Sequence, residues 1–426
     1  MVSPAKSQSQ RRAWPAKSTK MIPVPKAIDI VKRETSSLGS ETVRLSDSVG
    51  RILAEDILAD TDMPPFDRSQ MDGFAVIAED TLKAPVGLRI VGESAAGHGW
   101  HRTLKRGQAV RIMTGAPVPR GSDAIQRLEL ATEAGDLVTI NQPTEAGRYI
   151  VPRGSEIQRR GKLFGPGDAV DEKMVATLAA FGYSEIKVFV QPRVSILGTG
   201  SEIVMVEQKP GRDQIRNSNS VMLAAMCRQV GGVPRILRQT GDELEKLKST
   251  ISKATGLGEK KSSVRQSEIL VLTGGVSVGK YDLTKLALRD LGAEIFFERV
   301  RLRPGKPTVF GKLNDTLIFG LPGNPVSAAV TFYLFVRPAI LAVQGAKQMD
   351  LPSGFAALTG RAKGAKERDT YLPATLETDK SARLLATPLR WHGSSDFVGF
   401  AKADALIFVK RGQIIEAGEV APIAYL

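Results

Sequence analysis

The sequence predicts a multidomain protein of α/β and β structure, in which a central doubly wound α/β domain accompanies an inserted β-rich domain and a small C-terminal β-barrel. Between residues 192 and 343, apolar strand-like runs alternate with helical periodicity, as in a parallel sheet covered by helices. Residues 77–153 and 347–426 instead carry short strand-like runs separated by glycine and proline. At 426 residues the chain also exceeds the roughly 250 residues at which one core usually stops growing.

The first part of the chain is expected to form a domain that is interrupted by another. Helix, strand and helix are predicted in turn over residues 25–36, 41–45 and around 49–53. The pair Asp72-Gly73 predicts a tight turn before a strand over 74–77. The expected organisation is a disordered basic tail (1–20), a discontinuous linker and dimerisation domain (21–62 and 154–190), an inserted β-rich domain (63–153), the α/β domain (191–346) and the barrel domain (347–426).

The central domain is organised around residues 268–291. A buried strand over 269–272 leads into Gly274 and Gly275, and Ser277 lies in the same glycine-rich loop before a helix. Such a loop lets backbone N–H groups approach an anion, and the helix N-terminus adds a favourable dipole. Glycine also occurs at strand-to-helix turns for steric reasons alone, so both interpretations stay open.

The remaining elements of this domain follow the same alternation. Strands are predicted over 194–197, 233–238, 294–301, 308–310 and 316–319, and helices over 219–230 and 243–254. A long apolar helix is expected to run from Pro325 to about Val343, with Asn324 as its N-cap.

Composition limits the classes of function. The net charge of +14 is compatible with nucleic acid, but five of the basic residues lie in the first 20 positions and no nucleic-acid module is present, so an anionic small molecule explains the charge equally well. Cys227 lies in an apolar helix face and is expected to be a buried structural thiol. His98 and His101 have no third ligand nearby, which disfavours zinc. Without a membrane span or signal peptide, a cytoplasmic location is expected.

Acidic and basic residues are expected to meet at the carboxyl edge of the central sheet, where ligands of open α/β sheets bind. Glu202, Asp242 and Asp282 each follow a strand. Other loops of this half of the chain carry the basic residues Arg299, Arg303 and Lys306. Carboxylates alone would repel a phosphate, whereas a bridging Mg²⁺ would take oxygen ligands from both. Taken singly, the acids could also be helix caps and the lysine a solvated loop residue.

Six motifs in register resemble the molybdopterin molybdenumtransferase (MoeA) family. They are FDRSQMDGFAV (66–76), RIMTGAPVP (111–119), GTGSEI (198–203), TGGVSVGKYDLTK (273–285), RPGKPTVFG (303–311) and FGLPGNPVSAAVTF (319–332). Two departures are Arg299 and Arg303, which stand where some members have lysine; this retains the charge and changes the hydrogen-bond geometry. The final domain matches the family most weakly.

This resemblance implies a homodimer that inserts molybdate into adenylyl-molybdopterin with Mg²⁺, releasing AMP. It implies functional roles for Asp72, Thr114, Glu202, Asp242 and Asp282. It also implies molybdate contacts for Lys306, Pro307, Ser327, Arg368 and Ser394. Two alternatives are an adenylyltransferase of molybdopterin, which would not need residues 1–190 or 347–426, and a dimeric scaffold without enzymatic activity.

Overall fold

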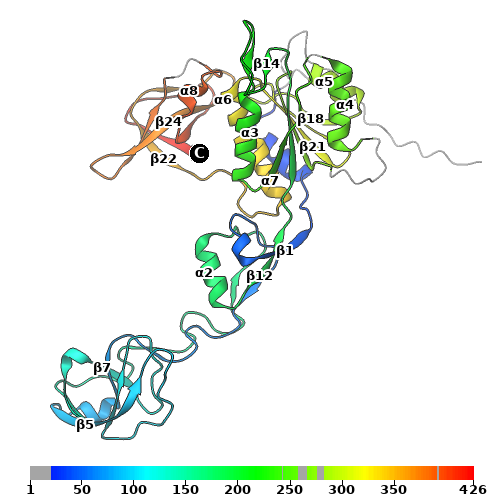
Figure 1. Cartoon of the computed structure of the whole chain (residues 1–426). Helices are drawn as coiled ribbons and strands as arrows, with labels where there is room; N and C mark the ends of the chain where they lie inside the picture. The colour runs from blue at the N-terminus through cyan, green and yellow to red at the C-terminus, as the bar shows by residue number, and fades with distance from the viewer. Residues whose placement is uncertain (1–20, 242, 258–265, 276–282, 391–392) are drawn as a thin grey trace, which may run out of the picture. The chain divides into compact units, whose positions relative to one another are not determined.

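The computed structural model describes residues 21–241, 243–257, 266–275, 283–390 and 393–426. The chain divides into two compact units (Figure 1). The first comprises the chain up to Ala54, Pro166–Glu172 and Glu185–Leu426, and the second comprises Glu55–Gly165 and Lys173–Ser184.

The first unit is built on a six-stranded sheet. In spatial order its strands are β16 (Val233–Ile236), β13 (Arg193–Gly198), β17 (Ile269–Thr273), β21 (Thr316–Leu321), β20 (Val309–Leu313) and β18 (Glu294–Phe297). The first four run parallel, and β20 and β18 run antiparallel to their neighbours. This order confirms the predicted α/β domain. Along the chain β13, β16 and β17 are separated by helices, and in the sheet β16 and β17 lie on opposite sides of β13.

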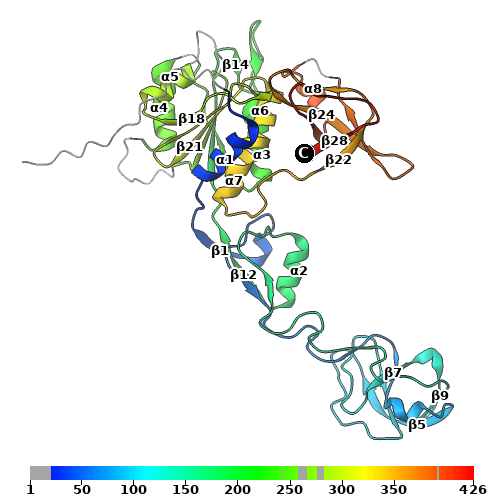
Figure 2. The same cartoon turned by 180° about the vertical axis from the view of Figure 1, so that it is seen from behind.

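Helices cover both faces of this sheet, as Figures 1 and 2 show from opposite sides. One face packs against α1 (Val24–Glu34), α3 (Ser218–Gln229), α6 (Pro325–Thr331) and α7 (Arg337–Val343), and the other against α4 (Leu244–Thr255) and α5 (Leu283–Asp290). Successive side chains of a strand point to opposite faces of the sheet: Val271 packs on the face covered by α1, α3, α6 and α7, whereas Leu270 and Leu272 pack on the face covered by α4 and α5. Strands buried on both faces explain the continuous apolar runs in the sequence.

The long helix after Asn324 is divided into three parts. Between α6 and α7 lies a π-helical segment, η4 (Phe332–Val336). Residues Pro325–Val343 are long and apolar enough to span a membrane, but 89% of that window is buried inside the protein. This helix is therefore explained as the core helix of the α/β domain.

The predicted helix around residues 49–53 is wrong. The chain forms a 3₁₀ turn, η1 (Leu45–Asp47), after β1 (Ser40–Arg44), and β1 pairs antiparallel with β12 (Glu185–Phe189). Ile52 and Leu53 then form bridges with residues far along the chain, Ala169 and Val188. Tertiary pairing of two apolar residues, rather than local helical periodicity, decides their conformation.

A closed five-stranded barrel near the C-terminus confirms the predicted final domain. Its strands are β24 (Asp369–Thr378), β25 (Leu384–Pro388), β22 (Ser353–Leu358), β28 (Val420–Tyr425) and β26 (Ala405–Val409), and pairing of β24 with β26 closes the ring. The short strand β19 (Leu302–Arg303) of the α/β domain pairs with the start of β24. Nearby lie the paired β23 (Ala362–Lys363) and β27 (Ile414–Ile415), and the one-turn helix α8 (Phe397–Phe400).

The second unit contains a six-stranded β-sheet. Its order is β7 (Ala124–Arg127), β4 (Gly73–Val76), β6 (Gln108–Ile112), β5 (Val86–Ser94), β9 (Leu137–Ile140) and β8 (Ala131–Ala134). Shorter elements are β2 (Ile57–Leu58), β3 (Arg68–Ser69), η2 (Ala78–Thr81), η3 (Leu128–Leu130), β10 (Ile150–Val151) and β11 (Lys162–Phe164). Helix α2 (Glu172–Ala180) is followed by Gly182 with φ of +77°, the left-handed conformation expected of its C′ residue.

Cys227 of α3 is fully buried in the core of the α/β domain, and burial raises the pKa of its thiol to about 12. At pH 8 the thiol is therefore protonated and shielded from reagents. We predict that the folded protein does not react with a thiol reagent such as DTNB at pH 8, and that denaturant exposes one reactive thiol. A fast reaction of the folded protein would contradict the packing of α3.

Candidate active site

Three parallel strands end side by side at one edge of the central sheet. Gly198 of β13 pairs with Thr273 of β17, and Thr273 pairs in turn with Leu321 of β21. The loops that begin at Thr199, Gly274 and Pro322 are therefore neighbours, as expected for a ligand-binding edge.

A polar network ties these loops together. The Asn219 side-chain amide donates to the Thr273 hydroxyl (3.0 Å) and to the Gly323 carbonyl (2.7 Å). The Thr273 hydroxyl donates to the Pro322 carbonyl (3.2 Å), and the Thr199 N–H donates to the Thr273 carbonyl (2.9 Å). Sequence reasoning missed Asn219, although a polar residue in the first turn of a helix that faces glycine loops is a recognisable signal. The network fixes all three loop starts.

The two glycines after β17 have conformations and surroundings that require glycine. Gly274 has φ of +92°, and a Cβ there would collide with the Thr199 carbonyl; Gly275 has φ of +60°, and a Cβ would lie 2.6 Å from the Thr284 hydroxyl. Steric need thus accounts for both, while anion binding by this loop stays a prediction. Ser277 lies outside the described residues.

Glu202 extends from the loop after β13. Its carbonyl accepts a hydrogen bond from the Ile215 N–H (2.8 Å), and its exposed carboxylate lies over Gly200, close to where a Cβ would be. Asp242 and Asp282 lie outside the described residues. Among the described residues, which do not include those two acids, no three His, Cys, Asp or Glu side chains form a metal-binding group.

The neighbours of the two undescribed acids do lie at this edge. The Gln239 amide donates to the carbonyl of Ile203, the residue after Glu202. The Thr284 hydroxyl lies 3.5 Å from the Gly274 carbonyl. The side-chain carbonyl oxygen (Oδ1) of Asn219 and the Thr240 hydroxyl are buried without a hydrogen-bond partner among the described residues. Oxygen atoms of this kind are the donors that Mg²⁺ prefers.

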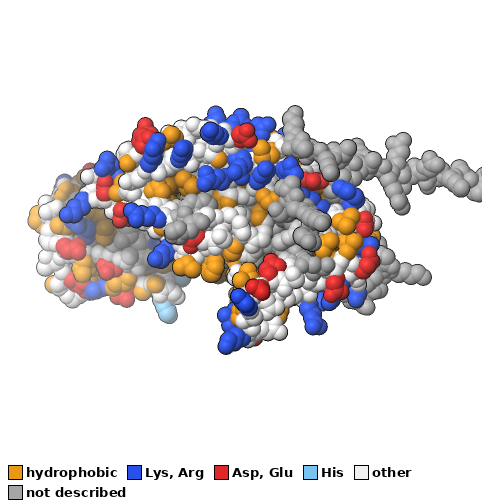
Figure 3. All heavy atoms as spheres, turned by 90° about the horizontal axis from the view of Figure 1, so that it is seen from above, with side chains coloured by type: hydrophobic (Ala, Val, Ile, Leu, Met, Phe, Trp, Pro, Cys, Tyr) orange, Lys and Arg blue, Asp and Glu red, His pale blue; other side chains and the backbone are white. Residues whose placement is uncertain are grey.

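The loop containing Lys306 is held against α6. Gly305, with φ of +120°, has no room for a Cβ beside Thr331, and its carbonyl accepts from the Thr308 hydroxyl (2.7 Å). The Lys306 carbonyl accepts from two N–H groups, and Pro307 follows, half-buried. No ion pair involves Arg299, Arg303 or Lys306 in the part of the chain that the structure describes. Many Lys and Arg side chains gather on the face viewed from above, the side on which β14 (Ile203–Val204) and β15 (Ile215–Arg216) lie (Figure 3).

Ser394 of the barrel domain is bound to the start of α6. Asn324 occupies the N-cap position as predicted, but its side chain does not cap the helix; its amide donates to the Ser394 hydroxyl (2.6 Å). The Ser394 carbonyl accepts from the Val326 N–H (3.1 Å). Ser327, one residue further, is 4% exposed. The structure therefore brings together three of the predicted residues from two domains.

Arg368 lies beside the same cationic loop. It immediately precedes β24, whose first residues pair with Leu302 and Arg303. The Asp369 N–H also donates to the Arg301 carbonyl (2.9 Å). Arg368 is half-buried and has no ion pair with any residue that the structure describes. The backbone pairing thus explains how a residue of the barrel domain reaches the loop that precedes Lys306.

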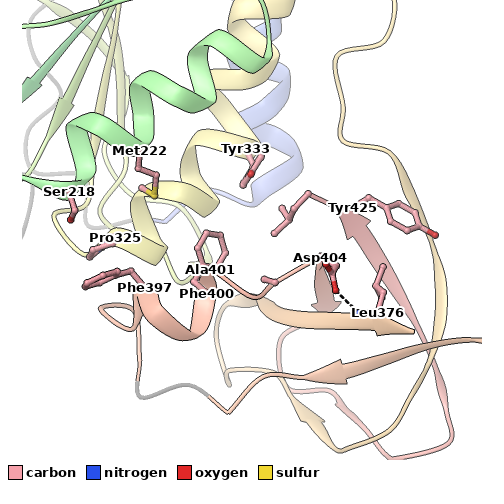
Figure 4. A pocket seen from close by; sticks show the side chains of 12 residues that line it. Ser218, Met222, Pro325, Tyr333, Leu376, Phe397, Phe400, Ala401, Asp404 and Tyr425 are labelled. Atoms are coloured by element: carbon pink, nitrogen blue, oxygen red, sulfur yellow. Dashed lines mark hydrogen bonds between the residues drawn. The ribbon is translucent and has the colours of Figure 1, made fainter. Parts of the chain in front are cut away.

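An apolar cavity of about 630 Å³ opens next to the contact between Asn324 and Ser394. Figure 4 shows Met222 of α3, Pro325 of α6 and Tyr333 of η4 on one side, and Phe397 and Phe400 of α8 on another. Sequence reasoning did not identify it, because its wall combines segments from several distant parts of the chain. Its mainly apolar wall is typical of cavities that bind small molecules.

In the second unit, Asp72 and Thr114 are paired. The Thr114 N–H and hydroxyl both donate to the same Asp72 carboxylate oxygen, at 2.6 and 2.9 Å. These bonds hold the pKa of Asp72 below its usual value, because they favour the charged form. Asp72 is thus more than the turn residue suggested by Asp72-Gly73 alone, and it belongs to a different unit from Glu202 and Lys306.

Three family models together match most of the chain. They are the MoeA N-terminal region, domains I and II (residues 22–182), the probable molybdopterin-binding domain (195–342) and the MoeA C-terminal region, domain IV (356–426). The molybdopterin molybdenumtransferase of Bacillus subtilis is 35% identical over 402 residues, covering 92% of this chain and 90% of its own.

Solved structures agree with these matches. Two structures of molybdopterin biosynthesis MoeA protein from Pyrococcus horikoshii are 31% and 26% identical to this chain, with TM-scores of 0.76 and 0.82. They cover 95% and 96% of this chain, and the match includes 99% and 100% of theirs.

Replacing Thr114 by valine tests the pairing with Asp72. The T114V variant keeps the backbone donor and loses the hydroxyl donor, so we predict that the Asp72 pKa rises towards its ordinary value without reaching it. A carboxylate whose pKa is lower in the folded protein than in the unfolded chain stabilises the fold at pH values above the unfolded-state pKa, and this stabilisation is lost as the pH falls through the folded-state pKa. Because the Asp72 pKa is lowered more in wild type than in T114V, wild type should lose more stability over that pH range. Carboxyl ¹³C NMR titration measures the shift, and an unchanged Asp72 pKa would show that the hydroxyl contributes nothing.

Proposed function

The chain belongs to the MoeA family of molybdopterin molybdenumtransferases, and we propose a specific reaction and division of roles from that premise. It is a transferase of molybdenum cofactor biosynthesis that inserts molybdate into molybdopterin. The proposed substrate is adenylyl-molybdopterin, the proposed requirement is Mg²⁺, and the proposed second product is AMP. The enzyme is proposed to work as a homodimer in the cytoplasm.

One observation carries the assignment of the site. Cations without an ionic partner among the described residues, including Arg303, Lys306 and Arg368, lie on or beside the segment that leads into β20, and β20 begins opposite Gly320 near the carboxyl end of β21. Unpaired cations together with rigid backbone are suited to anions that carry several oxygens, because each charge-assisted hydrogen bond is stronger than a neutral one. Both molybdate and a pyrophosphate bridge meet that description.

The oxyanion is assigned to the end of the site that two domains share. Lys306, Ser327, Arg368 and Ser394 are proposed to hold molybdate, with Pro307 shaping the loop. Support comes from the bonds that tie Ser394 to Asn324 and Val326, and from the pairing that places Arg368 beside β19. Residues held by backbone bonds lose little freedom when an anion binds.

The phosphates are assigned to the glycine loop and the flanking cations. The proposed contacts come from Gly274, Gly275, Ser277, Arg299, Arg303 and Asn324. Support comes from the close approach of backbone at Gly274, where the chain touches the loop after β13. Backbone N–H groups in such a turn form a concave site for anion oxygens.

Glu202, Asp242 and Asp282 are proposed to hold Mg²⁺. The described surroundings fit a hard cation, since two buried oxygen atoms, of Asn219 and Thr240, have no partner among the described residues. When bound, Mg²⁺ supplies charge neutralisation at phosphate oxygens. Glu202 extends from the ordered loop after β13 and offers its exposed carboxylate to that role.

The protein's own part in the reaction is positioning and electrostatic stabilisation. Cys227 is buried and its pKa is raised, so the lone thiol does not serve as a nucleophile. Lys306, Arg299 and Arg303 would stabilise charge that develops on the leaving phosphate, and the hydrogen-bonded starts of the three loops would help to align the reacting groups. Asp72 and Thr114 are proposed to contribute from the N-terminal region through a carboxylate that stays ionised.

The alternatives identified from the sequence explain less. A molybdopterin adenylyltransferase would use the α/β domain alone, whereas the family matches extend through both flanking regions. A scaffold without activity gives no reason for unpaired cations beside the carboxyl edge of the sheet. Purified protein supplied with adenylyl-molybdopterin, molybdate and Mg²⁺ should release AMP, and should not transfer adenylate from ATP.

Changing Asp282 to asparagine tests the acidic group. We predict that AMP release by D282N falls on the order of 100-fold, because one charged ligand is lost at the phosphates while the side-chain shape is kept. Release is measured by chromatography as a function of Mg²⁺ concentration. The matched control is D315N, since Asp315 is exposed in the turn between β20 and β21, and it should keep wild-type release. Wild-type activity of D282N would remove the acid from the proposed site.

A further inference from the structure

A second cavity, of about 570 Å³, lies where the α/β domain joins the barrel domain. Its cationic lining comes from Arg303 of β19, Arg361 and Lys363 around β23, and Lys366 in the loop before β24. None of its lining residues, among those that the structure describes, is acidic. The cavity is separate from the apolar cavity beside α8 and shares no lining residue with it.

The positive charge of this cavity is largely uncompensated. Arg361 has an ion pair with Glu416 (3.2 Å). Arg303, Lys363 and Lys366 have none with any residue that the structure describes, although surface cations elsewhere in the chain, such as Lys347, are paired. Like charges around one cavity repel each other, and the repulsion is relieved when an anion enters. The cavity is therefore electrostatically complementary to an anion.

The segment that carries the two lysines is held by backbone bonds. Lys363 pairs with Ile414 in the ladder between β23 and β27. The Gly364 N–H donates to the Gln413 carbonyl (2.9 Å), and a Cβ at Gly364 would collide with the neighbouring backbone. The Ala365 N–H donates to the hydroxyl of Thr370 (3.0 Å). The lysines thus project from a fixed frame, so that binding an anion does not require the loop to be ordered first.

Arg303 connects this cavity to the proposed active site. It pairs with Thr370 across β19 and β24, and it lies three residues before Lys306 in the same loop. Arg368 lies between Lys366 and Thr370 in the chain. The cavity therefore adjoins the cations that are proposed to bind molybdate and the phosphates in the active site. Arg361, Lys363 and Lys366 of the cavity have no proposed role in that active site.

We propose that this cavity is an accessory anion site, in which Lys363 and Lys366, together with Arg303, bind a doubly charged tetrahedral oxyanion beside the active-site loop. An apolar wall of Leu372, Pro388 and Leu389 limits the water around the anion and strengthens its attraction to the lysines. The shared chemistry is that of free molybdate and of a terminal phosphate group. Molybdate as the physiological ligand rests on the proposed function, whereas the existence of the site does not.

The double variant K363A/K366A tests the site without requiring catalysis. In equilibrium titrations of the full chain with molybdate, inorganic phosphate and AMP as separate arms, we expect wild type to show an anion site in addition to the proposed active site. The double variant should weaken this additional site at least tenfold and leave the other unchanged. Tight binding in the molybdate arm alone identifies a molybdate site, and binding in the phosphate or AMP arms identifies a phosphate site. Either result supports the cavity as an anion site.

The matched control is K253A/K380A, which removes the same charge from two exposed lysines outside the cavity. Equal weakening in both double variants would show a diffuse charge effect and overturn the proposal, as would unchanged binding in K363A/K366A.

Labelling wild type with a lysine-reactive ester gives a readout that does not depend on a variant's folding. The bound anion should protect Lys363 and Lys366, and not Lys253 or Lys380; equal labelling with and without anion would also overturn the proposal. AMP release in the reaction assay, tested separately, decides the proposed function.

Discussion

The site depends on the hydrogen bonds that Asn219 and Thr273 make where three parallel strands end. Backbone bonds between neighbouring strands continue into the first residue of two of these loops, through the N–H groups of Thr199 and Gly274, and the conformation that follows must be set by other contacts. One buried amide and one buried hydroxyl provide them, since they reach the carbonyls of Pro322 and Gly323 and each other. Without this network the strands would still pack through their apolar faces, but the loops that receive the ligand would not be held in one arrangement.

The charged part of the site is positioned by apolar packing. Leu302 is buried in the main core, and the adjacent Arg303 projects outward, while Gly305 lies close against Thr331 of α6. The loop is thus attached through its uncharged residues, and its cations stay available to a ligand. This separation avoids the strong desolvation that burial of a cation would cost. The uncharged residues of the loop therefore hold it in place, and this lets the fold keep several unpaired cations close together.

The sequence was sufficient to predict the sheet and its helices, because strands such as Ile269–Thr273 are continuous apolar runs and α5 keeps a helical period. It was insufficient where partners distant in the chain decide the outcome. Ile52 and Leu53 were predicted to be helical and instead form long-range bridges. The site residues divide in the same way: Lys306 and Gly274 belong to recognisable local motifs, whereas the contact of Asn324 with Ser394 joins residues 70 positions apart.

The barrel domain is best understood as part of the active-site architecture. Leu406 of β26 is buried in the same core as the α/β helices, and the parallel pairing of β19 with β24 continues the barrel sheet into the cationic loop. Two contacts of Ser394 with the start of α6 add a polar connection. A domain attached by a shared core and by backbone bonds places its side chains to within a fraction of an ångström, which a flexible linker cannot do. This attachment supports the proposal that Arg368 and Ser394 act together with Lys306, although the chain reaches them only after the α/β domain is complete.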